Sequence, residues 1–264
     1  MTTDDSLAGS FKTDGKACLV ISLERYENRW QATRENILDA GLRPIRLIAC
    51  DAQEMNDNTL YARYDASRNK SSYFAPLKRT EIACFLRHRK VWQEVADRNI
   101  PLVICEDDVD ASHTLPEFLK ALNETFSGYQ NVSVKLYSKG RCPGSVYNGW
   151  SGPDQLLQPN VVPLGAVAYW LTPTAARQFL AASETIFEPV DVFLQQSWRH
   201  QVVHYVAAPS FVREVSDVLG GTTQRNDRKT TFPNRLLREV RRPIYRFQLA
   251  LKSRKWSWER RKFG

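Results

Sequence analysis

Long apolar runs are missing from this sequence. No stretch approaches the roughly 20 consecutive apolar residues that cross a bilayer. The first ten residues, MTTDDSLAGS, have neither the basic residues nor the apolar stretch of a signal peptide. Of the 264 residues, 42% are hydrophobic and 25% are charged, as in ordinary globular proteins. We therefore expect a cytoplasmic protein, with one large α/β domain or two small ones.

Cysteine is scarce and its spacing is uninformative. The five cysteines form an odd set, and none of them shows the CxxC or Cys/His spacing of a zinc site. In apolar surroundings a free cysteine behaves as a small hydrophobic residue. We expect reduced, mostly buried thiols.

Excess positive charge is absent from the body of the chain. Residues 235–264 hold 11 Lys and Arg against 2 Asp and Glu, and because the whole chain carries +8, residues 1–234 carry only −1. A basic groove for nucleic acid would need cations within the body. We therefore expect no nucleic-acid partner, and we expect the basic tail to be a separate electrostatic device.

The tail has a helical pattern with two possible uses. On a helical wheel, one side of the tail is apolar and contains Leu236, Val240, Ile244, Phe247 and Leu251. Another side is cationic and contains Arg238, Arg241, Arg242 and Arg246. This pattern is typical of a helix lying on an anionic membrane, with Trp256 and Trp258 at the headgroups. The alternative is a helix packed on the catalytic domain. Pro243 makes two short helices as plausible as one.

The periodicity of apolar residues predicts a β-α-β arrangement in one domain over about residues 15–215. Strands are expected at 16–23, 43–50, 101–105, 131–138, 164–172 and 202–209. Helices are expected at 27–42, 79–99, 115–126, 172–183 and 189–200. Gly41 and Thr172 have the positions of a helix C-cap and a helix N-cap. Residues 51–79 and 140–163 are expected to be loops, the first of them mobile.

Four acids within five positions follow the strand in PLVICEDDVD (101–110). Their repulsion is tolerated when a cation lies among them, and the carboxyl edge of an α/β sheet is where such folds bind ligands. Three interpretations compete. Glu106, Asp107 and Asp108 could hold Mg²⁺ or Mn²⁺ against a nucleotide-sugar diphosphate. Asp108 and Asp110 could serve a haloacid dehalogenase-like phosphatase, or the acids could be a solvated surface turn.

Several further motifs occur in order along the chain. They are VISLER (20–25), TEIACFLRHRKVW (80–92), CEDDV (105–109), YWLTPTAA (169–176) and PVD (189–191). In this combination the sequence resembles glycosyltransferase family 25, the bacterial lipopolysaccharide and lipo-oligosaccharide transferases related to collagen galactosyltransferases. The resemblance covers about residues 18–217. It implies a GT-A-type single domain at 16–217, with a mainly parallel central sheet flanked by helices. A flexible N-terminus at 1–15 and the basic helical tail at 218–264 complete the expected organisation.

The resemblance also implies a metal and a donor site. Mn²⁺ or Mg²⁺ would be held by Asp108 and Glu106. The donor-binding residues would be Leu23, Arg25, Arg29, His88, Glu106 and Asp107. His88 could equally be structural, and His204 could join the metal. Arg87 stands where the family has a serine, so it could alter the contacts near the donor phosphates.

The implied reaction is an inverting transfer in which Asp191 is the general base. Asp191 could instead cap a helix. UDP-galactose is the first donor to test, and a lipid-linked oligosaccharide of lipo-oligosaccharide or lipopolysaccharide is the implied acceptor. We expect the enzyme on the inner face of the cytoplasmic membrane. The alternative from another class is a non-enzymatic module that binds nucleic acid or membranes through the tail.

Overall fold

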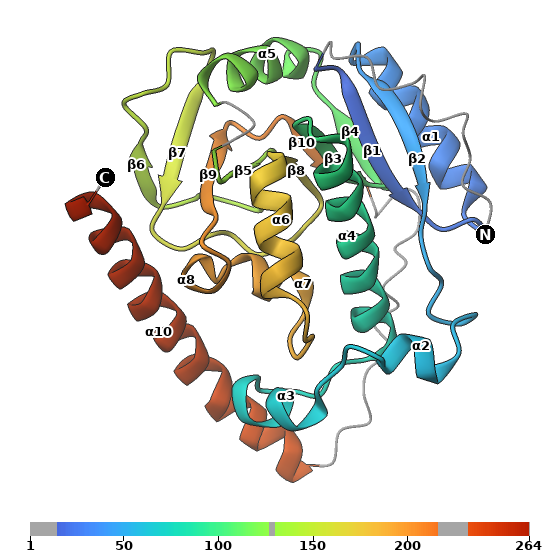
Figure 1. The fold of residues 1–264 in the computed structure, drawn as a ribbon, viewed down its shortest axis with the longest axis vertical. Helices are drawn as coiled ribbons and strands as arrows, with labels where there is room; N and C mark the ends of the chain where they lie inside the picture. The colour runs from blue at the N-terminus through green and yellow to red at the C-terminus, as the bar shows by residue number, and fades with distance from the viewer. Residues whose placement is uncertain (1–14, 127–129, 216–231, 264) are drawn as a thin grey trace.

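The computed structural model describes residues 15–126, 130–215 and 232–263. Its centre is an eight-stranded sheet in the order β2-β1-β3-β8-β5-β9-β7-β6, with helices packed against it (Figure 1). Six of the strands run in one direction, and only β8 and β7 run in the other. The predicted α/β class with a mainly parallel sheet is therefore confirmed.

The elements alternate along the chain much as the periodicity predicts. The strands are β1 (Ala17–Ser22), β2 (Arg43–Ile48), β3 (Leu102–Glu106), β4 (Val109–Ala111), β5 (Val132–Lys135), β6 (Gly144–Val146), β7 (Gln155–Pro159), β8 (Ala168–Leu171), β9 (Val203–Ala208) and β10 (Val212–Glu214). The helices are α1 (Glu27–Asp39), α2 (Asp57–Tyr61), α3 (Ala66–Ser72), α4 (Arg79–Arg98), α5 (Leu115–Thr125), α6 (Pro173–Ala182), α7 (Val190–Leu194), α8 (Ser197–His200) and α10 (Phe232–Phe263).

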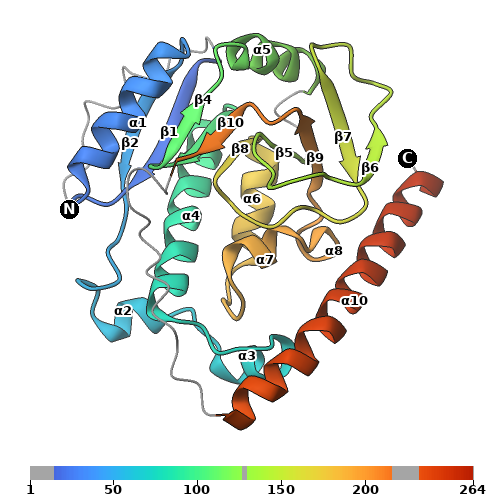
Figure 2. The ribbon, with the colours of Figure 1, turned by 180° about the vertical axis from the view of Figure 1, so that it is seen from behind.

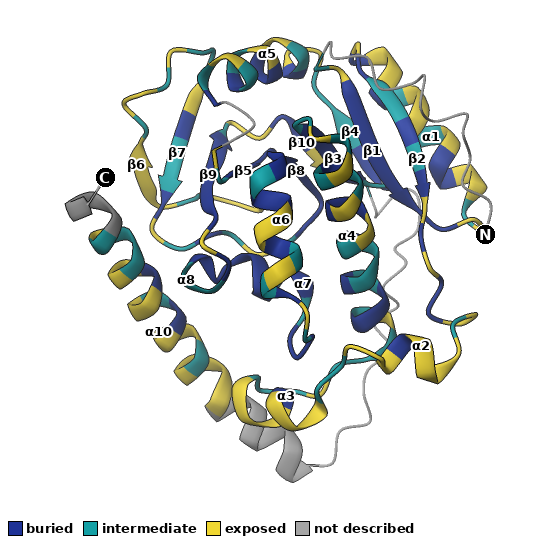
Figure 3. Ribbon diagram, in the orientation of Figure 1, coloured by how far each residue is buried: buried dark blue, intermediate teal, exposed yellow. Residues whose placement is uncertain are grey.

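The sheet separates two hydrophobic cores. Along β1, Cys18 and Val20 face one core, whereas Leu19 and Ile21 face the other, because successive strand residues point to opposite faces. The first core lies under α1 and α5 and beside the β4–β10 ribbon, which is best seen from behind (Figure 2). The second lies under α4, α6 and α7, and the central strands between the two cores, such as β1, β3 and β8, are buried (Figure 3).

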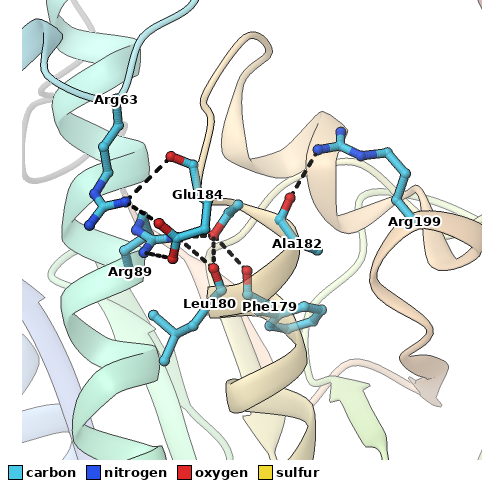
Figure 4. A network of polar contacts seen from close by, with 8 residues as sticks. Arg63, Arg89, Phe179, Leu180, Ala182, Glu184 and Arg199 are labelled. Carbon is cyan, nitrogen blue, oxygen red and sulfur yellow. Dashed lines mark hydrogen bonds and ion pairs between the residues drawn. The ribbon is translucent and has the colours of Figure 1, made fainter.

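Polar contacts fasten the C-terminal end of α6 to its neighbours (Figure 4). The Arg89 guanidinium of α4 donates to Leu180 O at 2.9 Å, and Arg199 of α8 donates to Ala182 O at 3.2 Å. Arg63, which follows α2, pairs with Glu184 at 2.6 Å. The last carbonyls of a helix lack their usual partner within it. Arg199 supplies one to Ala182 O, whereas Arg89 shares Leu180 O with Ser183 N.

Several predicted boundaries were right. Gly41 follows α1 with a φ of 79°, a value that glycine adopts without strain. The Thr172 side chain accepts from Ala175 N at 3.3 Å at the start of α6, as its N-cap position predicts. The five cysteines are free thiols, but only Cys18 and Cys105 are buried, so the expectation of mostly buried thiols was wrong.

Other predictions need correction. The expected loop at 51–79 contains α2 and α3, because Asn56 and Asp65 accept hydrogen bonds from backbone N–H groups at their N-termini. The expected loop at 140–163 contains the β6–β7 hairpin. The helix expected at 189–200 is divided into α7 and α8, and Pro243 lies inside one continuous α10. The flexible N-terminus and the boundary at 217/218 fall outside the described residues, apart from residue 15.

The tail helix α10 packs on the domain, which is one of the two uses predicted for it. Leu249 and Ser253 are buried, and the Tyr245 ring lies 5.8 Å and 5.9 Å from the rings of Tyr73 and Phe74 beside α3. Figures 1 and 2 both show α3 beside the lower part of α10. Among the described helices, α10 included, none is both long enough and apolar enough to cross a bilayer.

Candidate active site

A cavity of about 1280 Å³ opens where β1, β2 and β3 end. These three strands are parallel, so their carboxyl ends meet at one edge of the sheet, where open α/β folds bind ligands. The other walls come from the residues after α3, the first part of α4, the segment before β6, the loop before β8, the start of α7 and one face of α10. Ordinary small-molecule sites measure roughly 300–1,000 Å³, so this cavity has room for two ligands.

The structure brings six of the eight predicted site residues to this cavity: Leu23, Arg25, His88, Glu106, Asp107 and Asp191. Arg29 and Asp108 do not line it. Both are buried, with 4% and 5% of their surface exposed. The family resemblance placed Arg29 near the donor and Asp108 at the metal, but in the structure their side chains pair with each other.

Arg29 is the counter-ion of the acidic turn. Its guanidinium lies 2.7 Å from Asp107 Oδ1 and 2.8 Å from Asp108 Oδ2. Burial raises the pKa of Asp107, against the attraction of Arg29. Burial and then the nearby Glu106 raise the pKa of Asp108 to about 7, and its Oδ1 is buried with no hydrogen-bond partner. One arginine therefore leaves part of the negative charge of the three acids uncompensated.

A chain of polar contacts leads from the core to Glu106. Trp92 Nε1 donates to Tyr169 Oη at 2.9 Å, and the same oxygen lies 2.9 Å from His88 Nδ1. Burial raises the pKa of Tyr169 well above its usual range, so its hydroxyl keeps its proton. We interpret the contact with Nδ1 as donation by this hydroxyl. The ring proton of His88 then lies on Nε2, which is 3.8 Å from Glu106 Oε1. This order of donors aims an N–H group at the Glu106 carboxylate.

Cys84 completes a cluster with His88 and Glu106. One ligand atom from each of the three lies within 4.8 Å of the others, a spacing that could hold a metal ion. A metal would have to displace the thiol proton, and without one desolvation raises the pKa of the Cys84 thiol to about 12. We interpret the cluster as a support for Glu106, whose Oε1 atom lies 3.8 Å from His88 Nε2.

Asp191 lies at the start of α7, where it faces the cavity. Its Oδ1 accepts from Val192 N at 2.9 Å, so part of the predicted capping role is present. Burial nevertheless raises the pKa of the carboxyl, against that hydrogen bond and the attraction of Lys135. Lys135, which sequence reasoning missed, is buried below the loop before β8. Its Nζ donates to Pro163 O at 2.5 Å and to Gly165 O.

Sequence reasoning also missed the contributions of β2 and α10. Asp51 follows β2, lines the cavity and pairs with Arg25. It could have been found, because a polar residue directly after a strand next to β1 belongs to the same sheet edge. Arg87 lines the cavity and donates to Cys50 O at 2.8 Å. No local pattern in the sequence shows that Arg242, Tyr245 and Arg246 line the cavity.

Two other expectations receive no support from the geometry. Asp110, the second acid of the phosphatase alternative, pairs with Arg213 at 2.6 Å and is not part of the cavity wall. His204 packs against Phe179 and His200 in the core, with ring centroids 5.9 Å and 5.3 Å apart. His204 therefore does not lie at the cavity.

Comparisons with known proteins agree with the motifs. Residues 16–142 match the model of glycosyltransferase family 25 (LPS biosynthesis protein). Procollagen galactosyltransferase 2 of Mus musculus is 34% identical over 140 residues, which cover 49% of this chain and 21% of that relative. The apo crystal structure of mouse xyloside xylosyltransferase 1 aligns over 74% of this chain and 73% of its own, at 12% identity. Its TM-score of 0.35 is too low to carry an argument. The N-terminal half of this chain is therefore similar to glycosyltransferase family 25 and to a galactosyltransferase, and the chain spans about a fifth of the length of that relative.

Proposed function

We propose that this protein is an inverting, metal-dependent glycosyltransferase that moves a sugar from a UDP-sugar to a saccharide acceptor. The observation that carries the proposal is the gathering of Leu23, Arg25, Glu106, Asp107 and Asp191 at one cavity on the carboxyl edge of the sheet. Galactose is the first sugar to test, because the relative is named as a galactosyltransferase.

In this proposal the sheet edge holds the donor. The ends of β1 and β2 bring Arg25 and Asp51 to the cavity, and the end of β3 brings Glu106 and Asp107. Asp191 takes the proton of the acceptor hydroxyl while that oxygen forms a bond to the anomeric carbon. The bond from this carbon to the diphosphate breaks on the opposite face, and its electron pair leaves with the diphosphate.

The acidic turn fits a divalent cation. Glu106 and Asp107 line the cavity, and the buried, unpartnered Oδ1 of Asp108 marks negative charge that Arg29 alone does not compensate. Carboxylate oxygens are the ligands that Mn²⁺ and Mg²⁺ prefer. A bound cation would neutralise the donor diphosphate. Glu106 and Asp107 would hold it from the cavity side, and Asp108 would join them if it turned away from Arg29.

The test is turnover of nucleotide sugars. We expect the wild type to hydrolyse UDP-galactose slowly when Mn²⁺ is present and to stop when a chelator is in excess. Asp191→Asn should bind UDP as the wild type does, while transfer falls by roughly 10²–10⁴-fold, the usual effect of losing a general base. A panel of other nucleotide sugars serves as the comparison for the donor. If the protein hydrolyses no nucleotide sugar of the panel, the proposal is wrong.

The titration of Asp191 should make the rate of transfer depend on pH. Asp191 must be ionised to accept a proton, and burial raises its pKa above the ordinary 3.8. Transfer should therefore fall as the pH decreases through this raised value, at a higher pH than an unperturbed aspartate would give. The pH profile of kcat/KM measures this acid limb. An acid limb that persists unchanged in the residual activity of Asp191→Asn would assign the titration to another group.

We further propose that the enzyme works at an anionic lipid surface on a lipid-linked acceptor, as the family description suggests. The outer face of α10 exposes Ile244, Phe247, Leu251 and Trp258, by 52%, 65%, 49% and 54%. Helical spacing places the exposed Arg241, Arg254 and Lys255 beside these residues. An apolar stripe bordered by cations complements a membrane with acidic headgroups.

A further inference from the structure

The inner face of α10 is a wall of the cavity. Arg242, Tyr245, Arg246 and Leu249 all line it, and their spacing of three and four residues places them on one side of the helix. Leu249 is only 8% exposed, and Tyr245 packs between the ring pair Tyr73 and Phe74 and the body of the domain. The wall is therefore anchored to the domain.

Only one side of the cavity carries acids. They lie along the sheet edge and the starts of α4 and α7, where Arg25, Lys78, Arg79 and Arg87 also line it: Asp51, Glu81, Glu106, Asp107 and Asp191. The α10 wall and the segment before β6 contribute cations instead: Lys139, Arg141, Arg242 and Arg246. All four cations are exposed, and none of them forms an ion pair with another described residue. This part of the cavity therefore has a positive charge that the described side chains leave uncompensated.

Aromatic side chains accompany these cations. Tyr73, Phe74 and Tyr245 are half-buried and line the same part of the cavity, with ring centroids 4.3 to 5.9 Å apart. Aromatic rings offer a flat apolar surface with little conformational freedom, which suits the C–H face of a sugar ring. Arginine beside such a surface binds phosphate or carboxylate through paired N–H donors.

We propose that the α10 side of the cavity is the acceptor subsite and that the acceptor is a saccharide bearing phosphate or carboxylate groups. This inference rests on the proposed function, because it assigns the acceptor to the part of the cavity that the sheet-edge donor leaves open. The volume of about 1280 Å³ accommodates both. Asp191, the proposed base, would then stand between the donor and an acceptor held by Arg242 and Arg246.

Direct binding to three small probes tests the subsite. The probes are methyl glucoside, its 6-phosphate and methyl glucuronide, each titrated into the full-length protein by calorimetry with UDP as a fourth ligand. We expect the wild type to bind at least one anionic glycoside roughly tenfold or more tightly than the neutral one, the ordinary effect of charged hydrogen bonds. The phosphate and carboxylate probes distinguish the two kinds of anion.

Two double variants separate the subsite from general charge effects. Arg242→Gln/Arg246→Gln should lose the preference for the anionic glycoside while its UDP affinity and melting temperature stay those of the wild type. Arg241→Gln/Arg254→Gln makes the same charge change on the outer face of α10 and should keep the preference. An unchanged preference in Arg242→Gln/Arg246→Gln, or no preference in the wild type, would overturn the subsite.

The remaining outcomes are also decisive. If Arg242→Gln/Arg246→Gln loses UDP affinity, the two arginines belong to the donor diphosphate, and the acceptor assignment is wrong although the transferase function stands. If the wild type binds an anionic glycoside but no nucleotide, the proposed function fails while the anion subsite is supported.

Discussion

His88 acts, in our interpretation, as a positioning residue for Glu106. With the Tyr169 hydroxyl as the donor to Nδ1, the ring proton of His88 lies on Nε2. The carboxylate of Glu106, 34% exposed at its side chain, then meets an N–H donor on its protein side. This gives the histidine of the TEIACFLRHRKVW motif a role that requires no contact with the substrate.

Tyr169→Phe tests this role. The change removes the donor to His88 Nδ1 and leaves a buried nitrogen unpaired, which costs about 1–3 kcal/mol of unfolding free energy. We also expect weaker binding of UDP-galactose with Mn²⁺, and a ¹⁵N NMR shift of His88 that reports loss of the Nε2–H tautomer. Trp92→Phe is the matched control, since it removes an N–H group from the same oxygen but leaves the Tyr169–His88 contact. Equal donor affinity and an unchanged histidine spectrum in Tyr169→Phe would contradict the role.

For individual residues, the sequence predicts which ones lie near the cavity better than it predicts which side chains point into it. Leu23 and Arg25 follow β1, and Glu106 is the last residue of β3, so the sheet topology alone places them at the cavity. Arg29 and Asp108 lie close by in sequence, yet they pair below the cavity. Whether a side chain points into a cavity or into an ion pair depends on rotamers and neighbours, and the pattern of residue types contains neither.

Among the elements, the loop before β8 depends on β5. Lys135 of β5 is buried and donates to the carbonyl groups of Pro163 and Gly165, which both line the cavity. Burial lowers the pKa of Lys135 from 10.5 to about 8, against the attraction of Asp191. Two backbone carbonyls thus hold the ammonium in a place where charge is costly. We infer that this buried contact fixes the loop opposite the sheet edge.

Lys135 also predicts how stability depends on pH. Between about pH 8 and 10.5 the unfolded chain keeps a proton that the folded protein has released, so the unfolding free energy rises with pH. Lys135→Met lacks this titration. The unfolding free energy of the wild type minus that of Lys135→Met should therefore increase by about 1 kcal/mol per pH unit in this window. Urea unfolding at several pH values measures it, and a constant difference would assign an ordinary pKa to Lys135.

Elements with strong periodicity were predictable, and elements that depend on local capping or pairing were not. β1 is a short, continuous apolar run and α4 has apolar residues at helical spacing, so their existence could be predicted from the sequence. Short α2 and α3 begin at Asn56 and Asp65, within a polar stretch that has no apolar period. The β6–β7 hairpin has one strand whose residues are all exposed, which leaves no alternation to detect.

At the scale of the whole molecule, α10 joins the cavity to the outer surface. Its inner face lines the cavity and its outer face exposes an apolar stripe, so the tail is not the separate device that its charge suggested. A chain ending after Asn234 would lose the packing of Tyr245 and Leu249 and one cavity wall. We therefore expect this truncation to lower both the stability of the protein and its use of the acceptor. Removal of an independent tail would change neither. Point variants on the outer face are the better test of membrane binding.

Phe247→Ser/Leu251→Ser is the variant for that test. Both side chains are about half exposed, so the change should leave the melting temperature nearly unchanged. Burying such a side chain in a lipid surface contributes up to about 1.5–3 kcal/mol, so sedimentation with phosphatidylglycerol vesicles should weaken at least roughly tenfold. Leu38→Ser/Ile48→Ser removes similarly exposed apolar groups from α1 and β2 and should bind vesicles like the wild type. Rising salt should release the wild type, because screening weakens the attraction of Arg241, Arg254 and Lys255 to acidic headgroups. If the α10 variant and the control sediment equally, or if neutral vesicles bind as well as acidic ones, the stripe does not bind an anionic membrane.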